Sequence, residues 1–333
     1  MKNNLHIFLG ATVADAAARP LHWVYDQKKL NSYIKNKKDF AFLKNNKSPF
    51  YNIKTGKVSG YNEVGQVMFN TIIKEIDLTK SNVFGQKNLN LTVKKIERRF
   101  KTNVIKHFGQ GSLFWKNLKT RNKYKKIKWT KPINGPWIHQ NVIDTIKNIK
   151  AKKKVTGSIK VNESDGFCAA LPYFSIFNDF KNLKKVMSLI CAHSLSIKYG
   201  LAKFYIISFA LKGYTSPIKE FLKKFNSNKY FKQIISEIRE VIRFKSLNHQ
   251  KAAKKFGMAC SYPGNFKTSI HVILNSKSYK EAILKTIRAG GCNCSRANFI
   301  GAYFSAINPK QILNSNWLNK CSYSKEISIY LSK

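Results

Sequence analysis

The sequence is poor in acidic residues. Only 16 Asp and Glu accompany 61 Lys and Arg in 333 residues, which gives a net charge of +45. Only 8 of the basic residues are Arg, the side chain whose planar fork suits phosphates and base edges. The lysines are spread along the whole chain rather than gathered in one segment. We therefore expect a solvated basic surface and no specific nucleic-acid partner.

Long apolar runs and a disulfide framework are also missing. No run of 18 apolar residues occurs, so we expect no membrane span. The N-terminal segment does not resemble a signal peptide, because His6 and Asp15 interrupt its short apolar stretch. Six cysteines are too few for a disulfide framework at this length. These absences favour a cytoplasmic protein.

Helical periodicity dominates what remains, and strand-like alternation is scarce. Apolar residues recur at helical spacing in six segments: 90–108, 139–151, 182–199, 229–244, 266–274 and 278–288. The pattern predicts an all-α protein, a compact orthogonal bundle of about a dozen helices in one domain spanning residues 1–333. The polar stretches 76–90 and 118–136 are expected to be surface connections or lids.

The stretch AGGCNCSRANFIGA, residues 289–302, carries two cysteines one residue apart. Gly290 and Gly291 are expected to end the preceding helix, because glycine readily adopts the left-handed backbone found there. Cys292 and Cys294 should then lie at the N-terminus of the next helix. Exposed N–H groups and a partial positive charge at such an end stabilise a thiolate.

Polar neighbours support this interpretation of the cysteine pair. Asn293 or Ser295 is a suitable N-cap for the second helix, and Arg296 would stabilise a thiolate further if it folds back. The alternative is that both cysteines are small buried hydrophobic residues, as we expect for Cys168, Cys191 and Cys321.

Small residues at helical spacing occur near both ends of the chain. They follow the cysteines at Ala297, Gly301 and Ser305, and they fill the segment 10–18. Small side chains allow two helix backbones to approach closely. We therefore expect the first and last core helices to touch, which would bring Asp15 and the stretch 19–26 near the cysteines.

Five motifs make the sequence similar to the ADP-ribosylglycohydrolase family, and most of all to its branch of J-type crystallins and selenoprotein J. They are ATVADAAARPLHWVYD (11–26), HFGQGS (107–112), SDGFCAALP (164–172), GMACSYPGNF (257–266) and AGGCNCSRANFIGA (289–302). The resemblance spans nearly the whole chain. It implies a compact all-α fold and an ADP-ribose-like or other small ligand as partner.

The resemblance also implies where the family's chemistry would lie. Catalytic members hold two divalent cations, usually magnesium, with aspartates from an early and a late motif. Here Cys292 and Cys294 stand in place of the two late aspartates. Glu63 is the one carboxylate left in the region of the early motif, and His22 and Trp23 stand where the family has an acidic residue after its first helix.

Thiolates are soft ligands, whereas magnesium requires an octahedral shell of hard oxygens. We therefore expect no cofactor, or magnesium with Glu63 as a residual ligand if the family's site is retained. The candidate catalytic residues are Cys292, Cys294, Asp15 and Asp165. The residues expected to line a ligand-binding cleft are His22, Trp23, Asn293, Ser295 and Arg296.

Three functions are compatible with these residues. The first is a protein of the hydrolase fold that lacks the di-magnesium activity and has a binding or structural role. The second is a thiol redox activity at Cys292 and Cys294, whose disulfide would close a small, strained ring. The third is a retained hydrolase that acts on an ADP-ribosyl or related glycosidic bond through Asp15, Glu63 or Asp165.

Overall fold

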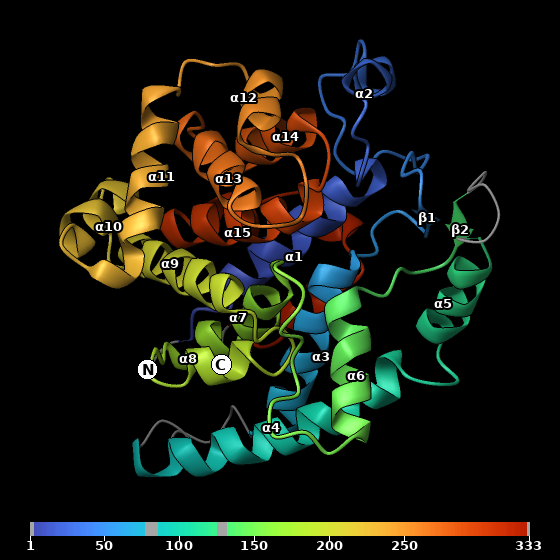
Figure 1. Ribbon diagram of the computed structural model, residues 1–333. Coiled ribbons are helices and arrows are strands. Elements are labelled where there is room, and N and C mark those ends of the chain that lie inside the picture. Colours follow the sequence, from blue (N-terminus) through green and yellow to red (C-terminus); the bar gives the residue numbers. More distant parts are fainter. Residues whose placement is uncertain (1–2, 77–85, 125–131, 332–333) are drawn as a thin grey trace.

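The computed structural model describes residues 3–76, 86–124 and 132–331, and the helical fold predicted from the sequence is confirmed (Figure 1). The α-helices are α1 (His6–Ala18), α2 (Gln27–Ile34), α3 (Gly60–Glu75), α4 (Gln86–Phe108), α5 (Leu113–Tyr124), α6 (Gln140–Lys150), α7 (Asp165–Phe177), α8 (Leu183–Met187), α9 (Ser194–Leu211), α10 (Pro217–Phe225), α11 (Lys232–Arg243), α12 (His249–Phe256), α13 (Gly264–Leu274), α14 (Tyr279–Ala289), α15 (Asn293–Ile307), α16 (Lys310–Leu313) and α17 (Ser324–Ser328). A 3-10 helix, η1 (Arg19–Leu21), follows α1 directly.

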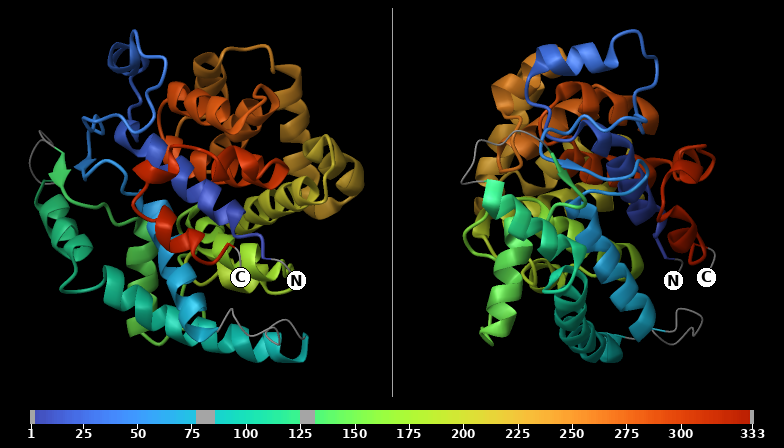
Figure 2. Two further views of the ribbon diagram at one scale, coloured as in Figure 1. Left: turned by 180° about the vertical axis from the view of Figure 1, so that it is seen from behind. Right: turned by 90° about the vertical axis from the view of Figure 1, so that its right-hand side faces the viewer.

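Helices α1 and α15 lie side by side through the centre of the molecule (Figures 1 and 2). Both are buried almost all round, and small residues line their contact. A Cβ atom built on Gly301 would lie 2.5 Å from the carbonyl oxygen of Gly10, so the two backbones nearly touch. The predicted contact between the first and last core helices is therefore confirmed.

The other helices surround this central pair. Helices α13 and α14 pack on α15 from one side, α9 packs on it from another, and α3 packs against α7 and α4 (Figure 1). The strands β1 (Tyr51–Asn52) and β2 (Ile133–Asn134) form a short parallel pair at one edge. This pair fixes the segment that enters α6 and so positions Trp137 and His139.

Three sequence predictions need correction in detail. The segment 182–199, expected as one helix, contains α8 and the start of α9. The chain turns between them, where the backbone of Cys191 pairs with that of Ser158 in an isolated β-bridge. The dozen expected helices are seventeen in the described chain, since several are only one or two turns long.

The third correction concerns the expected connections 76–90 and 118–136. Residues 77–85 and 125–131 lie outside the described residues. The flanking residues 86–90 belong to α4, residues 118–124 belong to α5, and β2 lies within 132–136. In the described part of the chain, no helix is both long and apolar enough to span a bilayer.

The substitution Gly301→Ala tests the contact between α1 and α15. Alanine is the better helix former by about 1 kcal/mol. Its methyl group would nevertheless lie 2.5 Å from the Gly10 carbonyl and 2.6 Å from Ala14 Cβ. We expect the free energy of unfolding to fall by about 1–3 kcal/mol in a denaturant titration.

The matched control is Ser32→Ala on the exposed face of α2, which should change stability by less than about 0.5 kcal/mol. Equal or higher stability of the Gly301→Ala protein would show that the two helices do not pack this closely.

Candidate functional site

The late motif forms a tight junction between α14 and α15. Gly290 and Gly291 both have left-handed backbones, with φ of +77° and +66°, and α14 ends there as expected. Helix α15 begins at Asn293, so Cys292 is its N-cap residue and Cys294 lies in its first turn. The predicted position of the cysteines at a helix N-terminus is confirmed. The predicted N-cap, Asn293 or Ser295, is wrong.

Asn293 and Ser295 have other roles at this junction. The Asn293 side chain donates to the carbonyl oxygens of Ala18 and Leu21, at 3.2 and 3.1 Å. Ser295 Oγ donates to the carbonyl oxygen of Cys292 at 2.9 Å. Asn293 therefore ties the start of α15 to the end of α1, while Ser295 braces the backbone of Cys292.

The Cys292 sulfur is fully buried among hydrogen-bonding groups. His22 Nε2 lies 3.4 Å from it, Ser295 Oγ 3.1 Å and Tyr61 Oη 3.6 Å. Burial alone would raise the pKa of the Cys292 thiol, but hydrogen bonds from Cys260, His22 and Ser295 outweigh it and hold that pKa well below its usual range. These neighbours therefore favour the thiolate form of Cys292.

The tautomer of His22 follows from its other neighbour. Burial raises the pKa of the Tyr51 hydroxyl far above its usual value, so Tyr51 keeps its proton and donates to His22 Nδ1 at 2.9 Å. Burial also lowers the pKa of His22. A neutral imidazole with its hydrogen on Nε2, directed at Cys292, satisfies both neighbours.

Several elements contribute the ionisable groups around Cys292. Tyr61 comes from α3 and Cys260 from the loop before α13, while Arg296 is on α15 itself. The titratable and charged groups that interact with this sulfur are His22, Tyr25, Tyr51, Tyr61, His139, Glu163, Cys168, Lys203, Cys260, Cys294 and Arg296.

Cys294 points to a different place, the seam between α1 and α15. Its sulfur lies 3.8 Å from the backbone oxygen of Asp15, and burial raises the pKa of its thiol well above the usual value. The Asp15 carboxylate accepts hydrogen bonds from the Ser59 amide (2.6 Å), the Ser59 hydroxyl (2.7 Å) and Asn298 Nδ2 (2.8 Å). Asp15 is thus near Cys294, as expected, but its oxygens are already engaged.

Burial dominates the ionisation of Asp15. It raises the pKa of the carboxyl from 3.8 to about 6, although the hydrogen bonds from Ser59 and Asn298 oppose this shift. Cys294 and Asp15 together form a sealed polar spot with no direct access to solvent.

Trp23 lies between the Cys292 site and the pocket. Its backbone is left-handed, with φ of +64°, which is unusual for a bulky residue. Two hydrogen bonds hold it there, from Trp23 N to Gly291 O and from Gly291 N to Val24 O. The indole stacks on His22 at 4.1 Å between ring centroids. The strained backbone therefore places an aromatic ring between Cys292's partner and the solvent.

A pocket of about 230 Å³ opens on the outer side of this indole. The aromatic residues Trp23, Tyr25, Phe50 and Trp137 line it, together with His139, Glu163 and Cys260. Cys260 Sγ accepts a hydrogen bond of 3.3 Å from Trp23 Nε1. The pocket resembles a small-ligand site, with an apolar wall and a few convergent polar groups.

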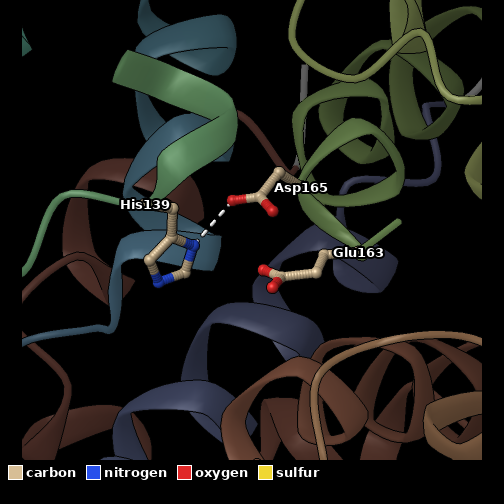
Figure 3. Close-up of side chains that lie close together, drawn as sticks. All are labelled: His139, Glu163 and Asp165. Carbon is tan, nitrogen blue, oxygen red and sulfur yellow. Dashed lines mark hydrogen bonds and ion pairs between the residues drawn. The ribbon is translucent and has the colours of Figure 1, made fainter. Parts of the chain in front are cut away.

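His139, Glu163 and Asp165 form one wall of the site (Figure 3). His139 Nδ1 lies 2.6 Å from Asp165 Oδ1, and Asn141 Nδ2 donates to the other carboxylate oxygen at 2.8 Å. Tyr61 donates to Glu163 at 3.1 Å. One ligand atom from each of the three residues lies within 4.8 Å of the others, so this group could hold a metal ion with one nitrogen and two oxygen donors.

Charge sharing within this wall shifts the ionisation of its members. Burial lowers the pKa of His139, but the adjacent Asp165 carboxylate more than compensates and leaves that pKa raised. Burial, and then the charge of Asp165, raises the pKa of Glu163 to about 7. His139 Nε2 is buried and has no hydrogen-bond partner among the described residues.

The sequence analysis missed two of these residues. The sequence predictions give no role to Glu163 or to His139, which is the N-cap of α6. The signal was the SDGFCAALP motif, since Glu163 directly precedes it and Asp165 lies within it.

Two further candidates, Glu63 and Arg296, make no hydrogen bond to the Cys292 sulfur. The Glu63 carboxylate accepts a hydrogen bond from Tyr323 at 2.9 Å and lies 3.2 Å from His107 Nε2. Arg296 donates to Thr286 Oγ1 at 3.1 Å and to the carbonyl oxygen of Gly290. Arg296 therefore braces the end of α14, and its guanidinium makes no hydrogen bond to the Cys292 sulfur.

The fold matches a known class. A solved structure of an "ADP-ribosylglycohydrolase-related protein complex" superposes with a TM-score of 0.61 at 10% sequence identity, over 99% of this chain and 95% of that one. The architecture is therefore that of an ADP-ribosylglycohydrolase-like protein, as the motifs implied.

Sequence comparison then gives particular relatives. Crystallin J1A of Tripedalia cystophora is 25% identical over 324 residues, which cover 97% of this chain and 92% of the crystallin. Crystallin J1B of the same organism is 23% identical over 331 residues, covering 98% and 94%. No family model matches the sequence. The similarity to J-type crystallins that the motifs predicted is thus confirmed over nearly the full chain.

The pH dependence of stability tests the environment of Asp15. The pKa of about 6 in the folded protein exceeds the usual aspartate value of 3.8, so folding favours the protonated carboxyl. This contribution is fully present below pH 3.8 and is lost as the pH rises through 6. Between pH 7 and pH 5 we expect Asp15 to add about 1 kcal/mol to the free energy of unfolding.

Denaturant titrations of the wild-type and Asp15→Asn proteins at both pH values measure this difference. The variant should lack the increase, while Asp39→Asn, at a surface carboxyl, should keep it. Parallel pH profiles of the wild-type and Asp15→Asn proteins would mean that Asp15 remains ionised across this range.

Proposed function

We propose that this protein is an ADP-ribosylglycohydrolase-fold protein of the J-type crystallin kind that does not catalyse the family's di-magnesium hydrolysis. The observation that carries the proposal is the chemistry of the late motif. Two sulfurs, from Cys292 and Cys294, occupy the positions where the resemblance implies aspartates. They face different partners, His22 and Asp15, and present no shared set of oxygens to a cation.

The remaining carboxylates support the same proposal. Asp15 is enclosed by Ser59 and Asn298, and Glu63 is engaged by Tyr323 and His107. Magnesium requires near-octahedral oxygen coordination and usually keeps several waters. The residues present do not fit a magnesium pair at the late motif, and we derive no catalytic step through one.

The aromatic pocket supports a binding role. Its volume of about 230 Å³ suits one planar ring rather than a complete dinucleotide-sized molecule, and the indoles of Trp23 and Trp137 line it. We propose a small ligand with one aromatic ring, such as the base of an ADP-ribose-like molecule. The carboxyl of Glu163 and the imidazole of His139 line the same pocket.

Calorimetric titration with magnesium, in the presence and absence of ADP-ribose, tests the loss of the metal centre. We expect no magnesium binding tighter than millimolar and no turnover of an ADP-ribosylated substrate. Glu63→Gln should behave like the wild type in both measurements, because Glu63 is engaged elsewhere. Micromolar magnesium binding that Glu63→Gln removes, or magnesium-dependent turnover, would overturn the proposal in favour of a retained hydrolase.

A second candidate function, thiol chemistry at Cys292, is favoured by a specific observation. His22 Nε2 and Ser295 Oγ lie 3.4 and 3.1 Å from a buried sulfur whose pKa lies well below its usual range. Thiolates are the reactive form of cysteine. The redox alternative predicted from the sequence therefore has its support at Cys292 rather than at Cys294.

The ultraviolet absorbance of the thiolate, followed from pH 4 to pH 10, tests this candidate. The wild type should show one thiolate already present below pH 7, whereas an ordinary thiol titrates near pH 8.5. Cys292→Ser should remove this step. Cys294→Ser is the matched control and should keep it, because the pKa of Cys294 is raised. Titration of every thiol above about pH 8.5 would exclude a thiolate at Cys292.

A further inference from the structure

Cys260 is a candidate disulfide partner for Cys292. It lies in the loop between α12 and α13, far from the late motif in sequence. The backbone N–H of Cys292 donates to the carbonyl oxygen of Met258 at 2.8 Å, so this loop runs directly beside Cys292. Cys260 Sγ accepts from Trp23 Nε1 at 3.3 Å, and the Trp23 indole stacks on His22, whose Nε2 lies 3.4 Å from the Cys292 sulfur.

The neighbouring cysteine, Cys294, is arranged differently. Its sulfur turns into the seam between α1 and α15 and lies against the Asp15 carbonyl oxygen, at 3.8 Å. The Cys292 sulfur turns the other way, toward His22 and Tyr61. The two cysteines of the late motif therefore share a helix turn but not a common site.

Access to the two sulfurs differs in a useful way. Cys260 lines the pocket and is partly exposed, whereas Cys292 lies behind it and is fully buried. A pocket of about 230 Å³ admits molecules much larger than hydrogen peroxide, since a water molecule occupies about 30 Å³. A small oxidant entering the pocket meets Cys260 first and can leave Cys292 as the partner behind it.

We propose that Cys260 and Cys292 form a redox-active pair that a peroxide converts to a disulfide. The inference rests on the thiol function proposed for Cys292 and names its partner. The Cys260 thiol gives its proton to solvent as its sulfur attacks one peroxide oxygen. The O–O bond breaks, and the leaving hydroxide takes a proton from solvent to become water.

The second step closes the disulfide. The Cys292 sulfur attacks the sulfur of the Cys260 sulfenic acid, the S–O bond breaks, and the leaving hydroxide takes a proton from solvent to form a second water. The two sulfurs together lose two electrons, which reduce the peroxide to two waters. Oxidation therefore changes the two sulfurs that contact His22 and Trp23 Nε1, and so it alters the hydrogen bonds of the aromatic residues beside the pocket.

Peptide mapping after treatment with stoichiometric hydrogen peroxide tests the pair. Trypsin releases Cys260 in peptide 256–267 and both late-motif cysteines in peptide 289–296. We expect these two peptides to become crosslinked and the free thiols to fall from six to four. Because one peptide holds both Cys292 and Cys294, the variants must identify the partner.

Three single substitutions make that identification. Cys294→Ser should retain the crosslink, and Cys292→Ser should lose it and leave Cys260 as a sulfenic acid that dimedone traps. Cys260→Ser should give no crosslink. Circular dichroism checks that each variant folds, and the Cys294→Ser result alone identifies the partner if Cys292→Ser does not fold.

The outcomes separate this inference from the function on which it rests. A crosslink lost in Cys294→Ser, or an internal disulfide within peptide 289–296, would overturn the pairing with Cys260. A low-pH thiolate at Cys292 without any crosslink would also overturn the pairing, while leaving the thiol function in place. Absence of that thiolate from the ultraviolet titration would remove the thiol function itself.

Discussion

The close contact between α1 and α15 is the constraint on which the rest of the structure depends. Glycines at positions 10 and 301 let the two backbones meet, and Asn298 then reaches Asp15 across the seam at 2.8 Å. The end of α1 continues through η1 to His22, and the start of α15 carries Cys292. Because both ends of this helix pair are fixed together, a histidine and a cysteine 270 residues apart in sequence share one site.

Local sequence rules predicted this part well. Glycine pairs after an amphipathic helix and small residues at helical spacing are signals that a few neighbouring residues determine. They located the helix N-terminus at Cys292 and the contact that brings Asp15 to Cys294. The same rules failed for 182–199, because the apolar pattern continues through the turn at which Cys191 bridges to Ser158.

The residues around the pocket, such as His139, Glu163 and Cys260, could not be predicted in this way. His139 meets Asp165 across 26 residues, and Tyr61 meets Glu163 across 102. The loop that carries Cys260 lies beside Cys292 through a hydrogen bond from the Cys292 amide to the Met258 carbonyl oxygen. None of these contacts leaves a periodic mark in the sequence, since each depends on how whole helices pack around the central pair.

Electrostatics explains why both aspartates of the late motif can be absent together. A buried carboxylate is costly unless a cation or several donors balance its charge. Two carboxylates at the start of α15 would need such a balance. In catalytic members of the family that the sequence resembles, the cations provide it. A single remaining carboxylate there would keep the cost and lose the cation pair. With two thiols, burial raises the pKa of Cys294 beside Asp15, while hydrogen bonds from neighbours such as His22 and Ser295 lower the pKa of Cys292. Hydrogen bonds and the buried cations Arg19 and Arg296 therefore balance these groups, and the Cys292 sulfur lies behind the pocket.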